Sequence, residues 1–362
     1  MYQRLYNHGI VRIDAERAHH LALRALATAT SLPGGTCALA HYVPEPDERL
    51  RLRVWDQPFS NPLGVAAGLD KNGDAVEALI ALGFGHIEVG TITLRPQPGN
   101  DRPRIWRVPE ESAVINAMGF PSSGAAAVRA HLIGLRAKGI VGINIGKNRD
   151  TPLDQAAEDY AGLISILFPI ANYFTINISS PNTPGLRSLQ MADELAHLLA
   201  TVRDANERAA TLARRDPKPL LIKIAPDLTD AEIEGVADAA VANGARGIVA
   251  TNTTTSRDGL PTHYGALPGG LSGPPLREQA DHVVRVLYRR IGDQIPIIGV
   301  GGIASGADAL ARIRSGATLV QIYTGLTWAG PALPGQILRH LSADADRTGW
   351  HSILDLVGAD AV

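Results

Sequence analysis

The chain has 362 residues, of which 45% are hydrophobic and 19% charged, so it is long enough for one large ordered domain with an extension. A formal net charge of -2 gives no indication of nucleic acid as a partner. The single cysteine, Cys37, excludes a disulfide framework and a cysteine-based metal site, and we expect no metal. No segment approaches the roughly 18 apolar residues of a membrane-spanning helix, and the first residues resemble neither a signal nor a transit peptide.

Residues 1–45 predict two short amphipathic helices. One apolar stripe at helical spacing consists of Tyr2, Leu5, Tyr6 and Ile10. The other, after a possible N-cap at Asp14, consists of Ala18, Leu21, Ala22, Ala25, Leu26 and Ala29. Because arginines outnumber acidic residues here, the helices could lie on a membrane surface. The alternative is a helical cap that closes the bottom of a barrel or packs on its side, and the residue pattern alone favours that cap.

Residues 46–61 are polar and contain prolines, which predicts a linker or a small edge hairpin. From about residue 62 onward, a short apolar run, a polar or glycine-rich turn and a longer amphipathic stretch recur. The eight apolar runs are Pro62–Gly68, His86–Thr93, Gly139–Lys147, Tyr173–Ser180, Pro219–Pro226, Gly247–Thr253, Ile295–Gly302 and Leu319–Gly325. Near-continuous runs of Val, Ile and Leu are typical of parallel strands buried on both faces.

The stretches between these runs predict helices. Examples are Gly124–Lys138, Leu153–Phe168, Met191–Arg214, Asp230–Ala242 and Leu276–Arg290. Thr229 can cap the helix that begins at Asp230. Eight such units predict an α/β protein with a closed (β/α)8 TIM barrel and a small N-terminal helical extension. An open doubly wound sheet is the second possibility, weakened because no GxGxxG motif follows the first strand.

Polar or glycine residues follow each predicted strand. They include Asp70, Lys71, Thr91, Asn144, Lys147, Asn177, Ser180, Thr251, Asn252, Gly301, Gly302, Tyr323 and Thr324, and Lys223 lies within the fifth strand. In a barrel these residues converge on one mouth, where active sites of this fold lie. The recurrence favours one extended polar ligand site over chance polar residues in turns.

The segment Thr175–Thr183 is the densest of these strand ends. Asn177, Ser180 and Asn182 would crowd one spot, and neutral polar groups cost free energy when they are buried unpaired. The cluster could therefore face a planar, hydrogen-bonding ligand. A helix N-cap is the other interpretation, and this segment alone does not decide between the two.

The last two strands carry a signal for phosphate. Gly299-Val-Gly-Gly302 and Tyr323-Thr-Gly325 let the backbone approach a ligand and expose N–H groups at helix starts. These two loops form the recurrent phosphate site of barrels. We expect a phosphorylated ligand, with flavin mononucleotide (FMN) as one candidate, although ordinary turn chemistry would also explain the glycines.

Several motifs together resemble dihydroorotate dehydrogenase over nearly the whole chain. They are Ala66-Ala-Gly-Leu-Asp-Lys71, Asn116-Ala-Met-Gly-Phe120, Asn177-Ile-Ser-Ser-Pro-Asn-Thr183, Lys223-Ile-Ala-Pro-Asp227 and Gly270-Leu-Ser-Gly273. Ser180, where class 1 enzymes have cysteine, and the N-terminal extension make the chain similar to the class 2, quinone-dependent, membrane-associated form. The resemblance favours membrane contact and a quinone tunnel for residues 1–45, with an FMN-binding barrel over 46–362.

The resemblance also implies site residues, with Ser180 as the catalytic base. The positions matching the contacts of one FMN per chain are Ala67, Gly68, Leu69, Asp70, Lys71, Thr91, Asn144, Asn177, Lys223, Thr251, Gly273, Gly302, Tyr323 and Thr324. Those matching the orotate site are Lys71, Asn116, Ala117, Met118, Gly119, Phe120, Asn177, Asn182, Asn252 and Thr253, where Ala117 stands in place of a basic residue of some relatives. His19 and Arg107 match positions at the quinone tunnel.

The implied reaction is oxidation of dihydroorotate to orotate in pyrimidine biosynthesis, with FMN taking the hydride and a membrane quinone as final acceptor. A single cysteine leaves no iron–sulfur cluster, and no nicotinamide fingerprint is present. The class implies a monomeric, peripheral protein on the cytoplasmic side of a bacterial inner membrane. The alternatives are a class 1-type or other FMN barrel oxidoreductase with a soluble acceptor, and a non-catalytic phosphate-binding barrel.

Overall fold

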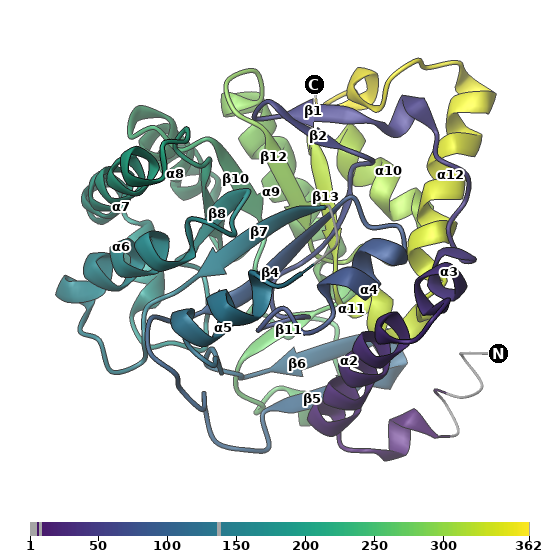
Figure 1. Ribbon diagram of the computed structural model, residues 1–362, viewed down its shortest axis with the longest axis horizontal. Helices are drawn as coiled ribbons and strands as arrows, with labels where there is room; N and C mark the ends of the chain where they lie inside the picture. The colour runs from purple at the N-terminus through teal and green to yellow at the C-terminus, as the bar shows by residue number, and fades with distance from the viewer. Residues whose placement is uncertain (1–5, 7–8, 136–138, 362) are drawn as a thin grey trace.

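The computed structural model describes residue 6 and residues 9–135 and 139–361, and Tyr2, Leu5 and Lys138 of the predicted helices lie outside these ranges. Eight parallel strands close into a barrel in the order β10-β12-β13-β3-β4-β7-β8-β9 (Figure 1). They are β3 (Leu63–Val65), β4 (His86–Ile92), β7 (Ile140–Ile145), β8 (Tyr173–Asn177), β9 (Leu220–Ile224), β10 (Gly247–Ala250), β12 (Ile297–Val300) and β13 (Leu319–Ile322). All eight predicted strands and the barrel are confirmed, and the open sheet is wrong.

The strands form where the sequence is apolar because both of their faces are covered. Every residue of β4, β8 and β9 is buried, with side chains filling the barrel on one side and helices packing on the other. Burial of these Val, Ile and Leu side chains is the main source of the barrel's stability.

Helices surround the barrel (Figure 1). They are α4 (Val76–Ala81), α5 (Ala125–Leu132), α6 (Ala156–Leu167), α7 (Ala192–Ala213), α8 (Asp230–Ala242), α9 (Arg277–Ile291), α10 (Gly306–Arg314), α11 (Thr324–Ala329) and α12 (Leu333–Thr348). The prediction for α8 is confirmed at both ends. Thr229 caps it, and the Glu232 carboxylate accepts the Thr229 N–H in a capping box. The helix predicted from Gly124 is shorter than expected and ends at Leu132.

Two small sheets occupy opposite ends of the barrel (Figure 1). The predicted edge hairpin is present as β1 (Leu52–Val54) and β2 (Gln57–Phe59). Its Trp55 ring packs 5.3 Å from the ring of Tyr173. The sequence did not predict the other sheet, in which β5 (Ile105–Val108), β6 (Ala113–Asn116) and β11 (Gly270–Ser272) pair antiparallel in the order β11-β6-β5.

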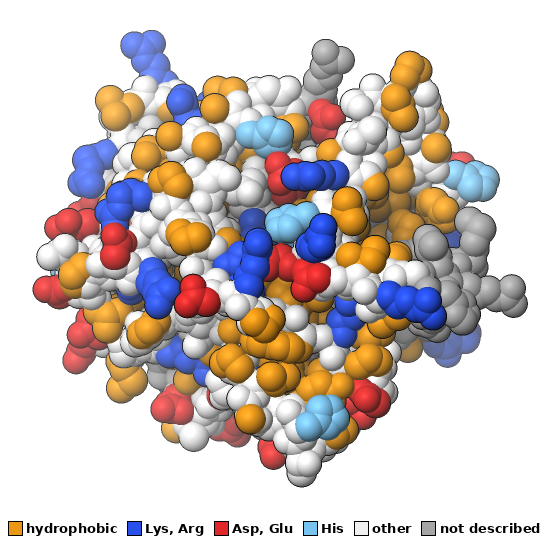
Figure 2. All heavy atoms as spheres, turned by 90° about the horizontal axis from the view of Figure 1, so that it is seen from below, with side chains coloured by type: hydrophobic (Ala, Val, Ile, Leu, Met, Phe, Trp, Pro, Cys, Tyr) orange, Lys and Arg blue, Asp and Glu red, His pale blue; other side chains and the backbone are white. Residues whose placement is uncertain are grey.

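The described part of the N-terminal extension lies beside β5 and α4. It contains η1 (Ile10–Arg12), α2 (Ala15–Ser31) and α3 (Gly35–Ala40), and Asp14 caps α2 as predicted by accepting the Arg17 N–H at 2.9 Å. Leu21 and Leu32 are more than half exposed. Figure 2 looks onto the side of the molecule where β5, β6 and α2 lie, and groups of exposed apolar side chains stand there between charged ones. No helix in the described ranges is long and apolar enough to cross a membrane.

Candidate active site

One cavity of about 720 Å³ opens at the carboxyl ends of the barrel strands and extends to α2. Most of the residues predicted for FMN, orotate and quinone line it. These are Ala67, Gly68, Lys71, Thr91, Asn116, Met118, Gly119, Phe120, Asn177, Ser180, Asn182, Lys223, Thr251, Asn252, Thr253, Gly273, Gly302, Tyr323, Thr324, His19 and Arg107. Four predicted residues do not line it: Leu69, Asp70, Ala117 and Asn144. The three predicted sites are therefore regions of a single continuous space.

The loops after β12 and β13, which the sequence predicts for phosphate, line the cavity. Gly302 has a φ of +75°, and a Cβ added to it would lie 2.5 Å from the Cα of Arg277. Only glycine fits this close approach in that conformation. Beneath the loop, the buried guanidinium of Arg312 donates to the Gly301 carbonyl at 2.8 Å and pairs with Asp281. Residues of both predicted phosphate loops line the cavity, and Arg312 is a support of the Gly301 loop that the sequence did not reveal.

Lys223 brings a buried ammonium to the cavity. It lies within β9 and is 5% exposed, and burial lowers its pKa although the nearby Glu88 carboxylate acts in the opposite direction. Among the described residues we find no hydrogen-bond or ion-pair partner for its ammonium. An unpaired buried cation is costly, so Lys223 fits a ligand edge that carries negative charge.

Amide side chains form a hydrogen-bonded cluster on the same wall. Thr91 Oγ donates to Asn144 Oδ1 at 2.6 Å, and Asn177 Nδ2 donates to the same oxygen at 3.1 Å. Asn182 Nδ2 donates to the Asn116 carbonyl at 3.2 Å, while its Oδ1 is buried without a partner in the described structure. A buried unpaired acceptor on a residue that lines the cavity fits a ligand with N–H groups, such as a planar pyrimidine.

The segment after β8 is a turn, so the interpretation of Thr175–Thr183 as a helix N-cap is wrong. The next α-helix, α7, begins only at Ala192 and has Met191 as its N-cap. Ser180 is 4% exposed, and its Oγ accepts the Asn182 N–H at 3.2 Å. In the described structure no histidine or carboxylate contacts this hydroxyl. The structure therefore brings Asn177, Ser180 and Asn182 to one cavity wall, as the sequence predicted.

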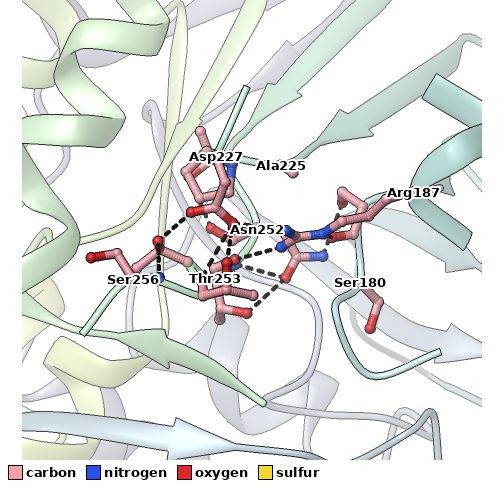
Figure 3. A network of polar contacts seen from close by, with 12 residues as sticks. Ser180, Arg187, Ala225, Asp227, Asn252, Thr253 and Ser256 are labelled. Carbon is pink, nitrogen blue, oxygen red and sulfur yellow. Dashed lines mark hydrogen bonds and ion pairs between the residues drawn. The ribbon is translucent and has the colours of Figure 1, made fainter. Parts of the chain in front are cut away.

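Arg187 fastens the Ser180 turn to the neighbouring strand ends (Figure 3). Its guanidinium donates to the carbonyls of Ser179 at 3.0 Å and Thr253 at 3.2 Å, and pairs with Asp227 at 2.8 Å. Asp227 also accepts a hydrogen bond from the Thr254 hydroxyl. One side chain thus ties together the segments after β8, β9 and β10. No feature of the sequence predicted this role of Arg187.

Lys71 stands at the mouth without an ion pair to Asp70. The Asp70 carboxylate instead accepts the backbone N–H groups of Gly73, Asp74 and Ala75 at 2.8–2.9 Å, so it shapes the turn. Lys71 Nζ donates to the Gly68 carbonyl at 2.7 Å. Burial, with a smaller contribution from the positive charge of Arg104, lowers the pKa of Lys71 to about 8. The amine can therefore receive an anionic ligand group.

An ion cluster joins α2 to the loop before β5. Glu16 is buried and accepts hydrogen bonds from Arg104 at 2.7 and 3.1 Å and from Arg102 at 3.0 Å. Burial raises the pKa of Glu16, but the hydrogen bonds from Arg104 and Arg102 outweigh it and lower the pKa to about 2. Arg104 also donates to the Asn100 carbonyl at 2.7 Å, and Asn100 in turn contacts the Ala117 and Asn182 carbonyls. The N-terminal extension is thereby connected to the segments around the predicted orotate site.

The end of the cavity beside α2 is apolar. Arg107 gives it one polar wall and donates to the carbonyls of Val11 and Ile13 at 3.3 and 2.8 Å. The ring of His19 lies 6.2 Å from that of Tyr323. Burial and the charge of Lys71 lower the pKa of His19 to about 3, so this histidine is neutral near pH 7. Apart from the Arg107 guanidinium this end is apolar and uncharged, which suits a hydrophobic ligand with one polar group.

Comparison with known proteins agrees with this geometry. The family model for dihydroorotate dehydrogenase matches residues 49–344. The chain therefore belongs to the dihydroorotate dehydrogenase family, whose members are flavin-dependent oxidoreductases with a TIM barrel.

The relatives point to one form within the family. The chain is 46% identical to a "dihydroorotate dehydrogenase (quinone)" from Deinococcus deserti over the full length of both proteins. It is 47% identical to one of the same name from Thermobifida fusca, covering 99% of this chain and 97% of that protein. A crystal structure of the ligand-free enzyme from Eimeria tenella superimposes with a TM-score of 0.86 at 35% identity, covering 96% of this chain and 99% of that one.

Proposed function

We propose that this protein oxidises dihydroorotate to orotate with FMN as its flavin and passes the electrons to a membrane quinone, in pyrimidine biosynthesis. The observation that carries the proposal is the single cavity that joins the glycine loops, the unpaired Lys223, the amide wall with Ser180 and the apolar end beside α2. A flavin and its two reaction partners require such adjoining regions. A soluble acceptor would give no reason for the apolar end.

The residues would divide the work in the following way. The loops at Gly302 and Thr324 would hold the phosphate of FMN, and Lys223 would lie against the flavin edge that gathers negative charge. FMN supplies the acceptor for the hydride that leaves ring carbon 6 of the substrate. Lys71 would pair with the substrate carboxylate, and the side chains of Asn116 and Asn182 would orient the ring through its amide edges.

Ser180 would take the proton from ring carbon 5 of dihydroorotate. Its Oγ already accepts the Asn182 N–H, and that donor stabilises negative charge as the hydroxyl loses its proton. Because no histidine or carboxylate contacts Ser180 in the described structure, a water or threonine relay would carry the proton away.

We assign residues 1–45 to membrane contact and the quinone tunnel, and residues 46–362 to the FMN barrel. Apolar side chains at Leu21 and Leu32 are exposed on the extension, and Arg107 and His19 stand at the inner end of the tunnel. The protein would then be peripheral, on the cytoplasmic side of a bacterial inner membrane. Flotation with anionic liposomes tests this: the wild type is expected to float, and a Leu21→Glu, Leu32→Glu variant with intact flavin is expected to stay in solution.

Anaerobic titration tests the first half of the reaction. The purified protein is expected to be yellow, and one equivalent of dihydroorotate per flavin is expected to bleach its absorbance. A colourless protein that folds normally and does not bind added FMN would contradict the proposal.

The low pKa of Lys71 predicts a pH dependence of ligand binding. Below pH 8 the amine is charged and pairs with the orotate carboxylate, so the dissociation constant of orotate should be nearly constant there. Above pH 8 the free protein must take up a proton to bind, and the constant should rise by about tenfold per pH unit. Lys71→Met should bind orotate weakly at every pH. A wild-type constant that stays flat well above pH 8 would contradict this role.

Removal of the buried carboxylate of the ion cluster should loosen the N-terminal extension. Glu16→Gln leaves the buried guanidinium of Arg104 without its counter-charge, so we expect the free energy of unfolding to fall by about 2–4 kcal/mol. Quinone reduction should fall more than flavin reduction. Glu48→Gln is the control, because it breaks the exposed ion pair with Arg51 and should cost less than about 0.5 kcal/mol in urea denaturation. Equal losses in the two variants would show that the cluster does not hold α2.

A further inference from the structure

A carboxylate lies inside the barrel beneath the active site. Glu88, in β4, is fully buried and does not line the cavity. Its Oε1 accepts a hydrogen bond from Asn144 Nδ2 at 2.8 Å. Its Oε2 accepts from Gln321 Nε2 at 3.0 Å, Thr175 Oγ at 3.1 Å and Tyr173 Oη at 3.3 Å. Four donors thus converge on a group that, when ionised, can only accept.

The carboxylate of Glu88 determines the orientation of the Asn144 carboxamide, and this orientation is continued by the neighbouring carboxamides. Since Asn144 gives its NH₂ to Glu88, its Oδ1 faces the other way and accepts from Thr91 and Asn177. Asn177 therefore presents its own NH₂ to Asn144, and its Oδ1 accepts from Asn252 Nδ2 at 3.3 Å. Asn252 Oδ1 in turn accepts the Thr253 N–H at 2.8 Å. The three carboxamides share one direction, and Glu88 stands at the start of the chain.

We propose that Glu88 is a positioning residue that fixes the orientation of the Asn144 carboxamide and through it supports the donor and acceptor order of Asn177 and Asn252, and thereby the ligand edges that this wall accepts. The inference rests on the proposed function, because the ligands concerned are the flavin and orotate. A carboxamide is nearly symmetric in shape, so packing alone does not distinguish its two orientations. The buried carboxylate supplies the missing distinction for Asn144, while the backbone N–H groups of Ser179, at 3.4 Å, and Thr253, at 2.8 Å, support the matching orientations of Asn177 and Asn252. The carboxylate also places a negative charge near Lys223.

Reversal of the donor and acceptor order of the carboxamides should weaken the binding of orotate. A carboxamide that presents NH₂ where a ligand also presents N–H leaves both donors unpaired in a buried site, and each such mismatch costs roughly tenfold or more in affinity. The effect should therefore reach orotate although Glu88 does not line the cavity.

Glu88→Gln tests the start of the chain. A glutamine that keeps its oxygen toward the donors on Gln321, Thr175 and Tyr173 must offer NH₂ to Asn144, which turns the chain around. The opposite orientation would require all three of those groups to turn from donor to acceptor. The probe is orotate, added to the flavin-loaded protein and followed by the shift in flavin absorbance. We expect the dissociation constant of orotate to rise at least about tenfold. Thr175→Val is the control, since it removes one donor to Oε2 and leaves the link to Asn144, and it should change the constant less than about threefold.

A double substitution tests whether the direction of the hydrogen bonds along this chain determines orotate binding. In Glu88→Gln with Asn144→Asp, the amide at position 88 donates to the carboxylate at position 144, which still accepts from Thr91 and Asn177. We expect orotate affinity to return to within about threefold of wild type, whereas Asn144→Asp alone, with two adjacent carboxylates, should lose it. A purely structural contribution of Glu88 predicts no such rescue.

Each outcome decides a separate question. Wild-type affinity in Glu88→Gln, or a double variant no better than that single one, overturns the inference. If Glu88→Gln does not fold, recovery of folded flavoprotein in the double variant supports the inference, and failure to recover it overturns the inference. If orotate causes no absorbance shift in the wild type, the proposed function fails instead.

Discussion

Replacement of Ser180 with alanine should lower the rate of flavin reduction by dihydroorotate by about a thousandfold, with FMN still bound. Removal of a positioned base typically costs roughly 10²–10⁴ in rate. No second base contacts the site of Ser180 in the described structure, so no neighbouring side chain would replace it. Stopped-flow absorbance under anaerobic conditions measures the reduction step alone.

The matched control is Ser188→Ala, on the same segment but exposed. The Ser188 hydroxyl donates to the Gly185 carbonyl at 2.7 Å and does not line the cavity. Its loss should change the reduction rate by less than about twofold, consistent with a surface position. Near-normal reduction in Ser180→Ala would remove Ser180 from the mechanism, even with an unaffected control.

Replacement of Lys223 with methionine should cost the protein most of its flavin. The buried ammonium has no hydrogen-bond or ion-pair partner in the described structure, and only the charge of the nearby Glu88 carboxylate favours it there, so direct pairing depends on the ligand edge. Methionine keeps most of the volume and removes the charge. We expect the dissociation constant of FMN to rise at least about a hundredfold, a loss within the range for one partner of a buried charged pair. Flavin content after purification and fluorescence titration with FMN measure it.

Lys147→Met separates flavin binding from the general effect of removing a buried lysine. Lys147 is 3% exposed and also follows a barrel strand, but its ammonium donates to the carbonyls of Asn148 and Thr151 at 3.1 and 2.8 Å. Its loss should lower the free energy of unfolding by about 1–3 kcal/mol and leave flavin content near one per chain. Full flavin occupancy in Lys223→Met would contradict the assignment.

The barrel could be predicted because each of its strands and helices has a recognisable pattern within its own short segment of sequence. Each strand is an apolar run and each helix an amphipathic one, and the carboxyl ends of parallel strands must meet at one edge. The sheet of β5, β6 and β11 could not be predicted in the same way, because Gly270–Ser272 pairs with a strand more than 150 residues earlier. Short antiparallel pairings of this kind carry little periodicity.

The polar residues of the site likewise divide into those that the sequence predicted and those that it did not. Asn177, Ser180 and Lys223 were found from strand ends and from family motifs, and the structure brings them to one cavity. The partners that hold the site in place were not found. Glu16 contacts Arg104 across 88 residues of sequence. In the sequence, Glu88 is a charged residue within an otherwise apolar strand, and this position alone predicts no role. Only the four hydrogen-bond donors that surround its carboxylate in the structure indicate one.

Steady-state oxidation of dihydroorotate with different electron acceptors distinguishes a quinone-dependent enzyme from one that uses a soluble acceptor. The full chain, loaded with FMN, would be assayed with ubiquinone and menaquinone analogues, fumarate and NAD at matched concentrations. The cavity that runs from the amide wall to the apolar end beside α2 predicts rapid turnover with a quinone and little with fumarate or NAD. Preference for fumarate or NAD would contradict the account.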